Sequence, residues 1–230
     1  MNSIDCKVLE SHGVTVSDLY EGAFQIKMKA EQLTREGKDA TDLYRKEYRI
    51  ISSLVEMGDP ASMILMGEML QGRKLPEFEE DSVRKAMSLW QKAATRGEAR
   101  GYTNIGLVYL HRSVPGGGNW FSDVEYDPEK AFECFLKGYE HGDSKAGRHV
   151  GLCYRDGLGI QKDEKMAYRY FCLAAERNDS TARYLKAECL YDGAGVEQNK
   201  EEALRIMRQL VEDRAHDADK AMEFITAHSV

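Results

Sequence analysis

Apolar residues recur at intervals of three and four along most of the chain, which is the spacing of amphipathic helices. Two kinds of apolar segment alternate. A segments carry a small residue, then an apolar or long residue, then Gly or Ala and a large residue; they span 62–70, 101–109, 146–154 and 182–190. B segments carry Ala and, four positions later, a large apolar residue; they span 85–94, 130–139, 166–175 and 202–211. This alternation predicts a series of antiparallel helix pairs.

The helix pairs recur with a constant period. Ala131, Ala167 and Ala203 hold the same place in their B segments and follow one another at steps of 36 residues. A period of this length indicates a solenoid, in which no pair buries its apolar face alone and stacking of neighbours forms the core. We therefore expect an all-α fold, a right-handed α/α superhelix of about five antiparallel helix pairs plus a C-terminal capping helix.

Helix-start signals divide the chain at consistent places. Asp59-Pro60 and Asp127-Pro128 each combine an N-cap Asp with Pro at the first helical position. Gly157 and Gly159, like Gly193 and Gly195 36 residues later, are expected to be turn glycines with positive φ. We predict one continuous domain with an N-terminal extension (1–16), a degenerate leading helix pair (17–58), four repeats (59–97, 98–142, 143–178 and 179–215), and a capping helix with a tail (216–230).

Two stretches, 154–179 and 190–214, resemble the Sel1-like repeat, whose helix A ends in Y-x-x-G-x-G-V before D-x-x-K-A and an aromatic-rich helix B. The resemblance extends over about 60–228. It implies a tetratricopeptide-like superhelix, and its usual role is protein–protein interaction without catalysis. We therefore expect a non-catalytic adaptor or scaffold that binds a protein or peptide, with no cofactor and no metal. A purely structural subunit of an oligomer is an alternative.

The second alternative is a secreted, cysteine-rich Sel1-like protein of the penicillin-binding or β-lactamase type. Such members join the end of helix B to the next helix A by disulfides, but no cysteine stands at the corresponding positions: Ala94 and Tyr102, Tyr139 and Gly147, Ala175 and Arg183. The chain has five cysteines, an odd number with no C-x-x-C, so we expect reduced and inert thiols. The β-lactamase-like Ser82-x-x-Lys85 lacks its S-D-N and K-T-G companions, and Ser82 is expected to cap a helix.

Charge disfavours several partners. The chain has 32 Lys and Arg against 39 Asp and Glu, a net charge of −7, whereas nucleic-acid-binding domains usually carry a basic excess. No apolar run approaches the ~18 residues of a membrane span. The first twenty residues contain no apolar signal-peptide core, so we expect a cytoplasmic protein, or a periplasmic or secreted one if a signal has been removed.

The resemblance also indicates where a partner would bind, because helix A lines the inner groove of a tetratricopeptide-like superhelix. The A-segment positions left over from packing are the candidate groove residues: Arg100, Thr103, Leu107, Lys145, Arg148, Leu152, Arg155, Tyr184, Glu188 and Tyr191. Cations beside Leu and Tyr suit an acidic segment or a C-terminal carboxylate of a partner. The alternative is an ordinary solvated helix face. If the groove binds, replacing Arg148 and Arg155 with Glu should abolish capture without lowering the melting point.

The second repeat carries nine additional residues, and its long loop at 112–127 reads RSVPGGGNWFSDVEYD. Long loops in compact domains are usually functional or disordered. Trp120 and Phe121 lie side by side in this loop. They either fold back over the helix ends or form a second partner-binding element, since exposed apolar patches often mark interaction sites.

Overall fold

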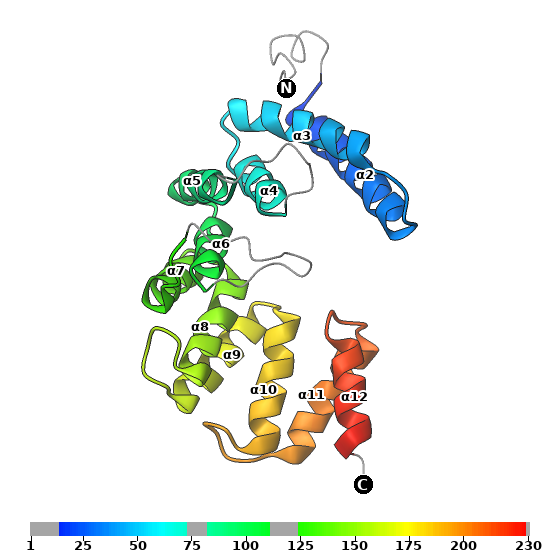
Figure 1. Cartoon of the computed structure of the whole chain (residues 1–230). Coiled ribbons are helices and arrows are strands. Elements are labelled where there is room, and N and C mark those ends of the chain that lie inside the picture. Colours follow the sequence, from blue (N-terminus) through cyan, green and yellow to red (C-terminus); the bar gives the residue numbers. More distant parts are fainter. Residues whose placement is uncertain (1–13, 73–81, 111–123, 229–230) are drawn as a thin grey trace. The chain divides into compact units, whose positions relative to one another are not determined.

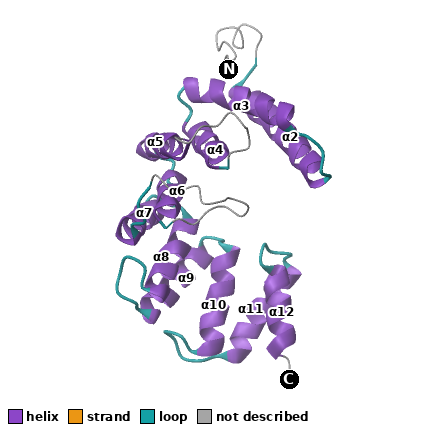
Figure 2. Ribbon diagram, in the orientation of Figure 1, coloured by secondary structure: helices purple, strands orange, loops and turns teal. Residues whose placement is uncertain are grey.

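The computed structural model describes residues 14–72, 82–110 and 124–228, and within these ranges every regular element is a helix (Figures 1 and 2). The helices are α2 (Val16–Arg35), α3 (Thr41–Glu56), α4 (Pro60–Gln71), α5 (Ser82–Thr95), α6 (Arg100–Tyr109), α7 (Pro128–Glu140), α8 (Ser144–Asp156), α9 (Glu164–Glu176), α10 (Ser180–Asp192), α11 (Lys200–Glu212) and α12 (Ala218–His228). The all-α prediction is confirmed for this part of the chain.

Most of these helices begin with an N-cap residue whose side-chain oxygen accepts a hydrogen bond from a backbone N–H group of the first turn. Asp59 accepts a hydrogen bond from the Ser62 amide at 2.7 Å, and Asp179 accepts one from the Ala182 amide, also at 2.7 Å. Such caps satisfy backbone donors that the first helical turn leaves without partners. Gly157 ends α8 and Gly193 ends α10 in the left-handed conformation, with φ of 70° and 76°. The predicted turn glycines therefore have the expected positive φ.

The helices group into two compact units, Met1–Glu125 and Tyr126–Val230, and the predicted domain and repeat bounds stay a prediction. The division falls inside the long loop of the second repeat.

In the first unit, α2 to α6 pack in chain order, each helix against the next. The centre is Trp90 of α5, which is fully buried and donates its indole N–H to the carbonyl oxygen of Ile64 at 3.1 Å. Gly67 of α4 makes this possible, because a Cβ there would lie 2.3 Å from the indole nitrogen. A small residue in helix A thus admits the large residue of helix B, as the repeat pattern predicts.

In the second unit, α7 to α12 also pack in chain order (Figure 1). Phe135, Phe171 and Met207, which the B segments place one repeat apart, are all fully buried. The second glycine of each loop also contacts the preceding repeat. A Cβ on Gly159 would lie 2.0 Å from the carbonyl oxygen of Pro128, and one on Gly195 would lie 2.0 Å from that of Glu164. These glycines bring loop backbone against the start of the previous helix B.

Candidate partner-binding surface

The first unit contains three of the predicted groove residues, all on α6. Arg100 forms an ion pair with Glu68 of α4, with 2.7 Å between Nη2 and Oε1. Leu107 is half-buried. Thr103 is only 3% exposed, so it does not offer the contact surface that its place in the A segment predicted.

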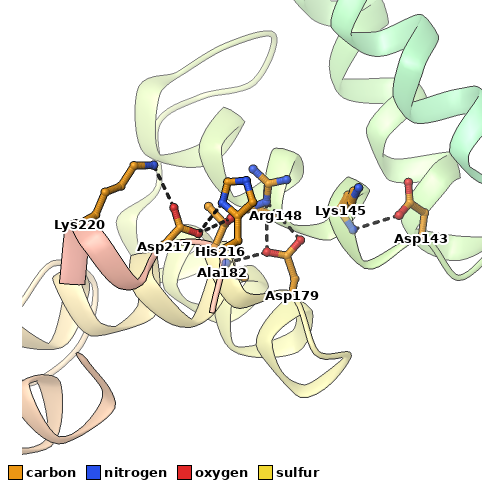
Figure 3. Close-up of polar contacts among 9 residues, drawn as sticks. Asp143, Lys145, Arg148, Asp179, Ala182, His216, Asp217 and Lys220 are labelled. Atoms are coloured by element: carbon orange, nitrogen blue, oxygen red, sulfur yellow. Dashed lines mark hydrogen bonds and ion pairs between the residues drawn. The ribbon is translucent and has the colours of Figure 1, made fainter. Parts of the chain in front are cut away.

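In the second unit, Arg148 of α8 reaches the next helix A. Its Nε donates to Asp179 at 3.2 Å, and Asp179, whose side chain is 5% exposed, also caps α10 (Figure 3). The guanidinium therefore compensates a buried carboxylate between two repeats. This corrects the expectation that Glu at position 148 would leave the melting point unchanged, because a second carboxylate would face Asp179 there.

The same kind of contact occurs one repeat further along. Thr181 of α10 donates its hydroxyl hydrogen to Asp217 at 2.6 Å. Lys220 donates to the same carboxylate at 2.9 Å (Figure 3). Asp217 lies just before α12 and is buried. Burial opposes its ionisation, but the hydrogen bonds from Thr181 and Lys220 outweigh this and lower the pKa of Asp217.

The first unit has an equivalent contact, in which the hydroxyl of Tyr20 in α2 donates to Asp59, the cap of α4. Sequence reasoning missed this series of contacts between successive A helices. The signal in the sequence is the Asp that precedes α4, α10 and α12, and of these only Asp59 is interpreted from the sequence, as a cap within its own repeat.

On α10, both predicted binding tyrosines contact the C-terminal helix. Tyr184 and Tyr191 meet the ring of Phe224 edge to face, with centroids 6.5 and 5.1 Å apart, and Tyr191 also contacts His228 at 4.7 Å. The capping helix α12 thus takes up much of the aromatic surface that was assigned to a partner. Such edge-to-face pairs contribute about 0.5–1.5 kcal/mol beyond their buried area.

Glu188 lies between the two tyrosines along α10 and is half-buried. Burial raises the pKa of its carboxyl group, while a hydrogen bond from Tyr184 and the charge of Arg155 act in the opposite direction. Arg155 itself is held by Asp156 through two hydrogen bonds of 2.7 and 3.0 Å. The Lys145 side chain is exposed and forms no ion pair with any described residue. Its hydrogen bond to Asp143 comes from the backbone N–H and leaves the side-chain ammonium group out of this contact.

Trp120 and Phe121, the predicted second binding element, lie outside the described residues, as does Cys6. Within the described residues, no disulfide joins Cys134, Cys153, Cys172 or Cys189. Burial raises the pKa of the Cys134 and Cys189 thiols to about 11, so both are protonated and weakly nucleophilic at neutral pH.

The helical residues carry no sign of a metal site or a membrane span. His149 and Cys153 share a face of α8, but His149 stacks on Phe135 with ring centroids 4.8 Å apart. No group of three His, Cys, Asp or Glu side chains suited to a metal occurs in the described ranges. None of the helices found there is both long and apolar enough to cross a membrane.

Comparison with known families explains the period. The model of the Sel1 repeat matches residues 60–98, 117–143, 145–179 and 180–212, which is more than half of the chain. The chain belongs to the Sel1 repeat family. The leading pair α2–α3 lies outside the matched ranges. Sel1 repeat proteins are generally non-catalytic scaffolds for protein–protein interaction.

The chain is also similar to solved structures of repeat proteins. A Sel1 repeat protein from Oxalobacter formigenes superposes with a TM-score of 0.68 at 19% identity, covering 93% of this chain and 79% of the other. This likeness confirms the helical solenoid fold. Cysteine rich protein B of Helicobacter pylori (TM-score 0.46, 21% identity) covers 61% of this chain and 95% of the other. A protective antigen of uropathogenic Escherichia coli with the same repeat fold (TM-score 0.43, 19% identity) covers 96% and 55%. No curated protein sequence matches the chain significantly.

Proposed function

We propose that this Sel1 repeat protein is a non-catalytic adaptor that binds a segment of another protein on the A helices of its second unit. The proposal rests on a difference among the A-helix side chains of α8 and α10: some pack against other repeats, and others stay exposed to solvent. Arg148 and the two tyrosines serve contacts between repeats, whereas Lys145 and Arg155 keep exposed or half-exposed side chains on α8. Leu152 of α8 packs against the core cluster of α9 and α10 and keeps part of its side chain exposed. Family membership supports a binding role for such a surface.

The chemistry of α8 favours an acidic segment or a C-terminal carboxylate as the bound group. Lys145 and Arg155 supply the cations, and Leu152 supplies apolar area between them. Exposed ion pairs contribute only about 0–1 kcal/mol each. The Arg155 guanidinium also already donates hydrogen bonds to Asp156, which leaves fewer of its N–H groups for a partner. Binding should therefore depend jointly on charge and on burial of Leu152, and it should weaken as salt is added.

The experiment compares two double variants that change the net charge equally. Lys145→Glu with Arg155→Glu alters the proposed surface, while Lys165→Glu with Arg169→Glu alters exposed positions on α9. Each variant and the wild type are used to capture partners from native lysate, with quantitative mass spectrometry. The first variant should lose a partner that the control retains, at a temperature where circular dichroism shows that both variants are folded. Equal retention by both variants would contradict the proposal.

The alternatives receive less support. The disulfide-linked, cysteine-rich type requires bridges between repeats, and no disulfide joins the four described cysteines. A purely structural oligomer subunit predicts self-association as the main captured species in the same experiment. Cytoplasmic localisation stays a prediction from the sequence.

A further inference from the structure

The leading pair α2–α3 lies outside the matched Sel1 repeats and carries a groove of its own. A hollow of about 380 Å³ is lined by the first half of α2, by Glu47 and Ile51 of α3 and by Leu65 of α4. A second hollow of about 460 Å³ is lined by the last half of α2, from Met28 to Arg35, and by Tyr44 of α3. Because the two helices are antiparallel, the two hollows follow one another along a single interhelical groove.

The α2 side of this groove exposes large apolar side chains. Phe24 is 54% exposed and Met28 is 43% exposed, and they lie one helical turn apart with Tyr20 one turn before them. Spacing of this kind forms a stripe on one face of a helix. Single exposed apolar residues are ordinary, but a stripe that borders a hollow is typical of an interaction surface.

The charges in the first hollow favour a basic group. Glu21 and Glu47 both line it, and Glu47 is only 5% exposed. Lys27 is the one cation among the described residues of this lining, and it pairs with Glu31 one turn further along α2, at 4.0 Å. Tyr20 and Phe24 add aromatic walls, and a cation beside an aromatic face gains about 0.5–2 kcal/mol. Carboxylates and aromatic rings together suit a Lys or Arg side chain.

We propose that the α2–α3 groove binds an amphipathic helix of another protein. The helix places its apolar face on Phe24 and Met28 and inserts a Lys or Arg into the first hollow beside Glu21 and Glu47. The 20 residues of α2 provide a platform of about 30 Å, enough for a helix of four to five turns. This site takes a partner of opposite charge to the one proposed for α8, and it does not depend on that proposal.

The test uses two labelled model peptides of about 18 residues, each an amphipathic helix, one built from Leu and Lys and the other from Leu and Glu. Fluorescence anisotropy with the full chain should show binding of the Leu–Lys peptide only. Phe24→Ala should weaken that binding at least about tenfold, as for a buried anchor. Met57→Ala removes a side chain of similar exposure (40%) outside the groove lining and should leave binding unchanged.

A second pair of variants separates the groove from the overall negative charge of the chain. Glu21→Lys alters the first hollow, and Glu133→Lys makes the same charge change at an exposed position on α7. Only Glu21→Lys should weaken binding of the Leu–Lys peptide. Equal effects of the two variants, equal binding of both peptides, or wild-type affinity in Phe24→Ala would each overturn the proposal. Self-association in sedimentation velocity that Phe24→Ala abolishes would overturn it too, since a second copy would then occupy the groove.

Discussion

Alanine substitutions at the paired loop glycines should separate the conformational strain of a positive φ from the steric overlap of a new Cβ with the preceding repeat. The sequence pattern does not distinguish these two costs. Gly193 and Gly195 have nearly equal positive φ, 76° and 71°, so a side chain at either should cost about 1–2 kcal/mol of conformational strain. A Cβ on Gly193 would come no closer than 3.3 Å to its neighbours. A Cβ on Gly195 would lie 2.0 Å from the carbonyl oxygen of Glu164 and 2.7 Å from the amide nitrogen of Lys165.

The backbone at the start of α9 must therefore move to admit the Gly195 substitution. Overpacking of this kind costs about 1–3 kcal/mol in addition to the strain. We expect Gly193→Ala to lower the free energy of unfolding by about 1–2 kcal/mol and Gly195→Ala by about 2–5 kcal/mol. The gain from a stiffer unfolded chain is common to both variants and cancels in the comparison.

The assay is urea unfolding of the full chain, followed by far-UV circular dichroism. Both glycines lie in the second unit, so both variants report on the same transition. Gly157→Ala and Gly159→Ala repeat the comparison 36 residues earlier, where the second glycine lies against Pro128. If the members of each pair lose the same free energy within about 0.5 kcal/mol, close approach between repeats is not what requires the second glycine.

Three further predictions follow from the buried acids and thiols. Arg148→Ala should lower the free energy of unfolding by about 1–3 kcal/mol in urea titrations, because Asp179 loses its cation, and Asp179→Asn in the same background should recover part of the loss. Burial opposes ionisation of Asp217, but its hydrogen bonds hold its pKa below the ordinary value. The ionised carboxylate therefore stabilises the fold above about pH 4, and this stabilisation is lost as the pH falls through the lowered pKa. Melting points measured from pH 6 to 3 should fall more steeply for the wild type than for Asp217→Asn. Partly buried Cys134 and buried Cys189, with thiol pKa values of about 11, should react slowly with iodoacetamide at pH 7.5 in the native protein and rapidly in urea, as peptide mass spectrometry would show. Fast alkylation of the native protein would contradict the raised pKa values.

The sequence predicts the fold well because the repeat pattern reports packing within each helix pair. Trp90 and Phe135 hold the predicted interior positions and are fully buried. The candidate site was less predictable. A residue on helix A that points away from its own helix B faces either solvent or the next helix A, and the period is the same in both cases. Thr103 and Tyr184 were therefore assigned to a groove, although Thr103 is buried and Tyr184 packs on α12.

The division of the chain inside the second repeat has an evolutionary consequence. Helices α6 and α7 form one repeat by sequence but belong to different compact units. Duplication of genes copies repeats at their sequence borders, whereas natural selection on stability acts on whole stacks of helices. A loop between two stacks is therefore a place where new sequence can be acquired without breaking either one, since lengthening a loop costs only about 0.6 kcal/mol for each doubling. The nine additional residues of this repeat stand at such a place.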